Sequence, residues 1–179
     1  MKKLFYSLIF ILLVGAIFTT ACQEPHITPK PGYRNYWRGF VNGVEWESDS
    51  VPYAEIDWAD STSIAFFFKH VLPHEDPLRN DVCILGRIPL DRIGDTIPLG
   101  PQIGRFGPPK AVFYLFSYDN AIANYEVVEA PNSWLYVNQL DNGDYYGSFE
   151  TRYLKTGGFN SVPGEVHIYC TEFRVIPSF

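Results

Sequence analysis

The sequence lacks the motifs of the common enzyme classes. It contains no Gly-x-Ser-x-Gly nucleophile elbow, no phosphate-binding loop and no dinucleotide-binding glycine pattern. It also lacks a cluster of basic residues, and its 20 acidic residues outnumber its 14 lysines and arginines. Because nucleic-acid binding requires cations that neutralise phosphates, this composition argues against a nucleic-acid partner. No motif indicates a cofactor, and we expect none.

Helical patterning is equally scarce. No window of useful length has the apolar spacing of an amphipathic helix, and no repeat of fixed period occurs. The chain instead combines 14 glycines and 14 prolines with 14 Phe, 12 Tyr and 4 Trp, a composition that favours strands and turns. Short strand-like runs occur at 36–41, 44–48, 53–58, 61–71, 82–89, 111–118, 123–129, 133–140, 145–154 and 165–176. They predict an all-β fold, a single antiparallel β-sandwich or barrel of about ten strands.

Two Asn-Gly pairs predict hairpin turns within this fold. Asn42-Gly43 and Asn142-Gly143 each lie between strand-like runs. A two-residue type I′ turn requires positive φ at both central positions, which asparagine and glycine tolerate best. The stretch 141–144, Asp-Asn-Gly-Asp, is superficially similar to a calcium loop, but it lacks the alternating carboxylates and the distant glutamate of such loops. We therefore interpret it as a turn.

No hydrophobic run is as long as a transmembrane helix requires, so we expect none. Two lysines precede the uncharged run Leu4–Phe18, which has the length of a signal-peptide core and falls short of the ~20 residues that span a bilayer. Small residues, Thr20 and Ala21, then stand directly before Cys22. This order predicts a signal peptide over residues 1–21.

The residues around Cys22 indicate what happens after cleavage. Thr19-Thr20-Ala21-Cys22 resembles the lipobox of bacterial lipoproteins, with threonine in place of the usual leucine. The resemblance implies that diacylglycerol is attached to the Cys22 thiol and that the new amino group is acylated, for example by palmitate. Two or more chains hold a protein stably to a membrane. Gln23 is not the aspartate that retains some lipoproteins in the inner membrane, which favours the outer membrane and leaves open the side that the protein faces. The alternative is an ordinary secretory signal that leaves a free cysteine.

The remaining chain divides into a tether and one domain. Residues 22–35 contain three prolines and no apolar period, and we expect a lipid-anchored tether there, followed by a β domain over 36–179. Cys83 and Cys170 are the two cysteines of that domain. In an exported protein they could form a disulfide if their strands are neighbours, with Cα atoms within ~7 Å. Each also lies in an apolar run that suits a buried thiol.

Three segments of the domain are similar to a known family. They are "FVNGVEWES" at 40–48, "ILGRIPLDRIGDTIPLG" at 84–100, and "YYGSFETRYL" at 145–154 with "PGEVHIYCTEFRV" at 163–175. Together they resemble Bacteroidota-type lipoproteins of unknown function. This chain departs from the family pattern at 96–99 and at 170–172. The resemblance implies a lipocalin-like or sandwich domain at the outer membrane, and it brings no known catalytic residue.

Candidate ligands for a metal are few. His70, His74, Glu75 and Asp76 have suitable chemistry, but Pro73 interrupts them and no helix places them on one face. A solvated loop is the better interpretation, and we expect no metal site.

Glutamates at 45, 47 and 126 could serve a carboxylate-based hydrolase that acts on cell-surface glycan. Such residues are also routine on surface strands.

Aromatic residues give the candidate binding site. Trp37, Trp46, Trp58, Trp134, Tyr145 and Tyr146 could stack on sugar rings or another flat ligand, although most aromatic residues of a β domain belong to its core. Trp134 and Tyr146 flank the second Asn-Gly turn, and we select them as ligand-binding residues. The sequence therefore favours a membrane-anchored, non-catalytic binding or scaffolding module whose partners are the membrane and an envelope ligand such as glycan. The glycan hydrolase and a purely structural envelope protein are the alternatives.

Overall fold

The computed structural model describes residues 35–47, 52–56, 61–71, 79–102, 107–117, 120–129 and 131–177. The chain divides into two compact units, Met1–Tyr33 and Arg34–Phe179, and all of these residues belong to the second. The expected signal peptide and Cys22 therefore lie outside the described residues. In the described part, no helix has both the length and the apolar character that a membrane crossing requires.

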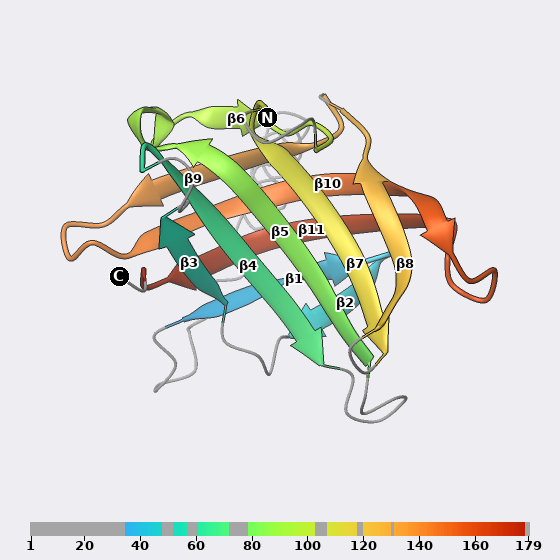
Figure 1. Cartoon of the computed structure of the whole chain (residues 1–179). Helices are drawn as coiled ribbons and strands as arrows, with labels where there is room; N and C mark the ends of the chain where they lie inside the picture. The colour runs from blue at the N-terminus through green and yellow to red at the C-terminus, as the bar shows by residue number, and fades with distance from the viewer. Residues whose placement is uncertain are drawn as a thin grey trace, which may run out of the picture. The chain divides into compact units, whose positions relative to one another are not determined.

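The fold is all-β, as predicted, and consists of one large antiparallel sheet curled into a half-barrel (Figure 1). A single 3-10 turn, η1 (Leu90–Arg92), is the only helical element in the described ranges. The order of neighbouring strands is β2-β1-β11-β10-β8-β7-β5-β4-β3, with β9 beside β10 and β6 beside β9. The eleven strands are β1 (Tyr36–Val41), β2 (Val44–Glu47), β3 (Tyr53–Ile56), β4 (Ser63–Val71), β5 (Arg79–Pro89), β6 (Thr96–Pro98), β7 (Lys110–Ser117), β8 (Asn120–Val127), β9 (Trp134–Gln139), β10 (Tyr145–Gly158) and β11 (Glu165–Val175).

The long strand β10 serves two partners in turn. Its first half, through Glu150, pairs with β9, and its second half, from Tyr153, pairs with β8. β3, the strand at one edge of the sheet order, is linked to the segment after β11 by a bridge between Ala54 and Pro177. Asn35 strengthens the same region, because its side chain donates to the Pro52 carbonyl (3.1 Å) and accepts from the backbone N–H of Ile176 (2.9 Å).

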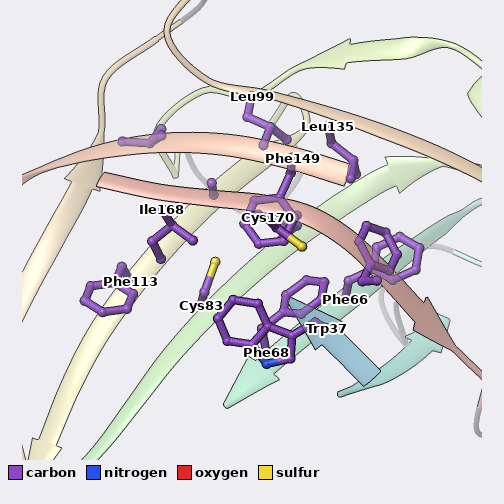
Figure 2. Close-up of a cluster of buried hydrophobic side chains, with 14 of the residues drawn as sticks. Trp37, Phe66, Phe68, Cys83, Leu99, Phe113, Leu135, Phe149, Ile168 and Cys170 are labelled. Atoms are coloured by element: carbon purple, nitrogen blue, oxygen red, sulfur yellow. The ribbon is translucent and has the colours of Figure 1, made fainter. Parts of the chain in front are cut away.

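The interior is packed with aromatic rings from both walls of the half-barrel. Phe68 on β4 contacts Phe149 on β10 (ring centroids 4.8 Å apart) and Phe173 on β11 (5.2 Å). Figure 2 shows Phe68 and Phe149 converging with Trp37 and Ile168 around the two cysteines. Since burial of apolar area is worth ~25 cal/mol per Å², this cluster is the main source of stability.

Both Asn-Gly hairpins form, but only the first has the expected turn. Asn42 and Gly43 both have positive φ (51° and 78°), as a two-residue type I′ turn requires. In the second, only Gly143 has positive φ (89°), and its N–H donates to the Leu140 carbonyl (2.9 Å). The Leu140 N–H in turn donates to the Asp144 carbonyl (2.8 Å), so the β9–β10 turn is a longer loop that ends on a left-handed glycine.

One strand was not predicted. β6 lies in the glycine- and proline-rich segment after residue 90, and it pairs with β9 through three residue pairs, Thr96 with Tyr136, Ile97 with Leu135, and Pro98 with Trp134. Ile97 and Leu99 are fully buried. The segment becomes a strand because these two side chains fill the interior beside β9.

Candidate functional site

Trp134 and Tyr146 both lie on the outer face of the sheet. Trp134 begins β9 and Tyr146 is the second residue of β10, and both side chains are half-buried. Their neighbours Leu135 and Tyr145 are buried, so period-two alternation directs the selected residues outward. Trp134 pairs with Glu150, and Tyr146 pairs with Asn138, four residues further along the ladder. At ~3.4 Å per residue, the two aromatic side chains are ~14 Å apart along the strands and share one face.

Three further aromatic residues connect and extend this pair. Tyr136 lies between them on β9, opposite Ser148, and is half-buried. On the other side of β10, Glu150 pairs with Tyr169 of β11, which pairs with Phe40 of β1. Tyr169 and Phe40 are 41% and 38% exposed, high values for such large side chains. We call the outward side chains of Trp134, Tyr136, Tyr146, Tyr169 and Phe40 the aromatic face.

A polar cluster lies in the middle of the aromatic face. The Glu150 carboxylate accepts a hydrogen bond from His167 Nε2 at 2.8 Å, and Arg152 lies 3.7 Å from the same oxygen. Each of these side chains remains partly exposed. The position of His167 is fixed by the first hairpin turn, because Asn42 Oδ1 accepts from the His167 backbone N–H at 2.8 Å. A carboxylate, an imidazole and a guanidinium therefore stand beside the rings of Trp134 and Tyr169.

At the end of the aromatic face beyond Tyr146, one ion pair and one hydrogen bond fix the side chains. Arg174 pairs with Tyr146 across the ladder and donates to Asp144 Oδ2 from both Nε (3.0 Å) and Nη2 (2.6 Å). Asn138 Nδ2 donates to the Tyr146 hydroxyl at 3.1 Å.

Next to Arg174 on β1, Tyr36 donates a short hydrogen bond to Glu172. Burial, with a smaller contribution from Glu172, raises the pKa of Tyr36 to about 12. Tyr36 therefore stays neutral and remains a hydrogen-bond donor at physiological pH.

Two of the other aromatic candidates do not reach the surface. Trp37 is 2% exposed and Tyr145 is 4% exposed, and both point into the core. Trp46 is partly buried and packs edge-on against Trp37 with ring centroids 5.3 Å apart. These three residues contribute to stability, since a stacking site requires rings that a ligand can reach. Trp58 lies outside the described residues.

Sequence reasoning missed Tyr136, Tyr169, Phe40 and the polar cluster. The local signal was present, because Trp134-Leu-Tyr136 and His167-Ile-Tyr169 alternate outward polar-aromatic and inward aliphatic side chains. What joins the two patterns is the pairing of β9, β10, β11 and β1, which local sequence does not specify.

Glu45 and Glu150 lie too far apart to form a catalytic pair. Glu45 lies opposite Phe40, three strands away from Glu150, the carboxylate of the polar cluster. At ~4.8 Å per strand this places the two ~14 Å apart, beyond the ~5–9.5 Å that glycoside cleavage uses. Glu126 is exposed on β8. Neither the side chain of Glu47 nor that of His70 is among the described ones.

The metal candidates His74, Glu75 and Asp76 also fall outside the described ranges. Within those ranges, no group of three or more His, Cys, Asp or Glu side chains is placed to hold a metal ion.

Cys83 and Cys170 are free thiols in the interior (Figure 2). Their strands are not the neighbours that a disulfide was expected to require, because β7, β8 and β10 separate β5 from β11 in the sheet. Cys83 Sγ lies 3.3 Å from the Tyr153 hydroxyl, and Cys170 donates to the Glu172 carbonyl at 3.4 Å. Burial raises the pKa of Cys83 to about 12 and raises that of Cys170 as well. Both thiols are therefore unreactive in the folded protein at neutral pH.

Comparison with known proteins found no matching family model, no matching curated protein and no matching solved structure.

Proposed function

We propose that this protein is a lipid-anchored binding module of the cell envelope, and that the aromatic face binds glycan. The observation that carries the proposal is the row of outward residues that runs across four strands from Trp134 through Glu150 and Tyr169 to Phe40. The row contains three aromatic rings and one carboxylate, which lies between Trp134 and Tyr169.

The rings supply the apolar part of recognition. Sugar rings present flat C–H surfaces, and aromatic side chains offer large rigid contact area at low cost in conformational entropy. Tyr136 and Tyr146 are diagonal neighbours across the β9–β10 ladder, at the ~7–8 Å separation typical of such pairs. Trp134 continues the same line along β9. The arrangement suits an extended oligosaccharide that contacts successive rings.

The polar cluster supplies the hydrogen-bonding groups that would orient a bound sugar. Glu150 retains acceptor capacity after its bond to His167, and Arg152 offers guanidinium donors. Neighbouring sugar hydroxyls both donate and accept hydrogen bonds, so the cluster can contact them without a metal or a cofactor. Hydrogen bonds to charged groups are worth ~1.5–3 kcal/mol, more than neutral ones.

The anchor is part of the proposal. Cys22, in its lipobox-like context, would hold the domain at the outer membrane, and the β domain would bind its ligand within tether reach of that membrane. A hydrolase is less well supported, because Glu150 and Glu45 are too far apart for the two-carboxylate mechanism.

A thermal-shift screen with neutral, acidic and amino-sugar oligosaccharides tests the proposed function. A ligand that binds only the folded state stabilises it by mass action, by ~2.7 kcal/mol at a hundred times Kd. We expect at least one glycan class to raise the melting temperature. A screen in which no glycan class raises the melting temperature would contradict the proposal.

A further inference from the structure

The opposite outer face of the sheet carries a group of neighbouring apolar side chains. One row across it reads Tyr53, Phe67, Ile84 and Val112, and ends at Glu126. The next row reads Lys69, Val82, Tyr114 and Asn124. We call the outward side chains of Tyr53, Phe67, Ile84, Val82, Tyr114 and Phe116 the apolar face.

These side chains point away from the core. Phe67 lies between Phe66 and Phe68, which are 0% and 1% exposed, and it is itself half-buried on the other side of β4. Tyr53 stacks on Phe67 with ring centroids 4.6 Å apart and planes 4° from parallel. Tyr114 and Phe116 form a second ring pair on β7, 5.8 Å apart. An antiparallel sheet usually turns a polar face to water, so an apolar face of this extent indicates a contact surface.

The apolar face and the aromatic face lie on opposite walls. The inner sides of the two walls pack on each other, as the contacts of Phe66 and Phe68 with Phe173 demonstrate. Figure 1 shows β3, β4, β5 and β7 in front and β10, β11 and β1 behind. A partner bound to the apolar face would therefore leave the aromatic face accessible to a ligand on the other wall.

The site where the tether joins the domain lies at the margin of the apolar face. Asn35 donates to the carbonyl of Pro52, and the next residue, Tyr53, opens β3 and the first apolar row. Residues 23–34 separate Asn35 from the proposed lipid at Cys22, and even fully extended they span only ~40 Å. A short linker gives an effective concentration in the millimolar range, so even a weak affinity of this face for lipid suffices to hold it on the membrane.

We infer that the apolar face docks on the phospholipid surface that holds the Cys22 anchor, and this inference rests on the anchor that belongs to the proposed function. The chemistry fits the boundary between headgroups and acyl chains. Phe67, Ile84 and Val82 supply apolar area, and Tyr53 and Tyr114 each combine an apolar ring with a hydroxyl, as is typical of residues at membrane interfaces. Lys69 is exposed at the end of its row, where an ammonium can reach the lipid phosphates. Docking in this way turns the aromatic face away from the membrane.

Spin labels on the full-length, lipidated protein in phosphatidylethanolamine–phosphatidylglycerol vesicles test the inference. Tyr114→Cys and Lys69→Cys place a nitroxide on the apolar face, the second at an exposed position. Ser148→Cys is the control on the aromatic face. Cys83 and Cys170 are buried with raised pKa values, so the wild-type protein should take up no label in the same time.

We expect the labels at 69 and 114 to collide several-fold more with oxygen, and several-fold less with a water-soluble nickel chelate, than the label at 148. If the protein floats with the vesicles and all three labels are equally open to the chelate, the docking is wrong and the anchor stands. If the protein does not float, anchor and docking are both wrong. If the labels at 69 and 114 are shielded from both reagents and their spectra are broadened by a label on a neighbouring copy, a second copy of the protein covers the apolar face. That result would overturn the assignment of this face to lipid.

Discussion

His167 donates a 2.8 Å hydrogen bond from Nε2 to the Glu150 carboxylate across the ladder between β10 and β11. The direction follows from chemistry, since an ionised carboxylate can only accept. The two residues are diagonal neighbours, because Glu150 pairs with Tyr169 and His167 pairs with Arg152. The bond holds the carboxylate in place among the rings of the aromatic face.

Glu150→Gln should weaken glycan binding and leave the free energy of unfolding almost unchanged. Ion pairs at exposed positions contribute ~0–1 kcal/mol, and glutamine can still accept from His167, so we expect the free energy of unfolding to change by less than ~1 kcal/mol. Loss of the charge should weaken glycan binding by about fivefold, the ~1 kcal/mol that separates charged from neutral hydrogen bonds. Urea denaturation and calorimetric titration measure the two quantities. Unchanged glycan affinity would show that Glu150 does not take part in binding.

Gly147→Ala should be strongly destabilising. A Cβ at this position would lie 2.1 Å from the Tyr136 carbonyl oxygen and 3.0 Å from the Phe173 ring, so the β9–β10 pairing must shift. Overpacking of this kind costs about 1–3 kcal/mol, and we expect the upper half of that range. Gly164→Ala is the matched control, because nothing lies within 4 Å of the added methyl. Equal denaturation midpoints for the two variants would contradict the close approach of β9 and β10.

Alkaline pH should destabilise the protein before the lysines titrate. Burial raises the pKa of Cys83 from 9.0 to about 12 and that of Tyr36 from 10.0 to about 12. The unfolded state therefore loses protons first, and the stability that these neutral groups contribute is complete below pH ~9 and declines as pH rises toward ~12. Denaturation midpoints at pH 8, 9, 10 and 11 should fall in that order.

Tyr36→Phe should flatten this decline above pH 10 only in part, because burial also raises the pKa values of Tyr145 and Tyr153. A midpoint that stays constant to pH 11 would show that these groups titrate normally in the folded state.

Cys22→Ser should release the protein from the membrane. Serine has no thiol to receive diacylglycerol, so the variant would lack its acyl anchor. Cell fractionation should find the wild type with membranes and the variant in the soluble fraction, and a variant that still pellets with membranes would contradict the anchor. A wild-type protein that washes off with high salt would indicate peripheral attachment and no lipid.

Local chemistry explains what the sequence could predict. The Asn42-Gly43 turn forms as expected because its two residues tolerate positive φ without help from the rest of the fold. Strands such as β4 were recognisable from continuous apolar runs. β6 was not, because Thr96-Ile97-Pro98 has a turn-like composition and becomes a strand only through its pairing with β9.

The candidate site was half predictable for the same reason. Tyr145 and Tyr146 are adjacent and chemically identical, yet the first is buried and the second lies on the aromatic face. Only the register of β10 decides between them. Tyr169 and Phe40 join the site through pairing between distant segments, which no single-sequence pattern reports. The facing arrangement of Cys83 and Cys170 across the interior depends on the curl of the whole sheet.

Calorimetric titration of the full-length protein in detergent, with the glycan that raises its melting temperature, measures whether the aromatic face binds that glycan. The matched variants are Tyr136→Ala, in the middle of the aromatic face, and Leu154→Ala, at a 52% exposed position further along β10. The account predicts that Tyr136→Ala lowers affinity about tenfold, equal to ~1.4 kcal/mol, and that Leu154→Ala binds as the wild type does. Wild-type affinity in Tyr136→Ala and in Trp134→Ala, with both variants folded, would contradict the claim that the aromatic face is the binding site.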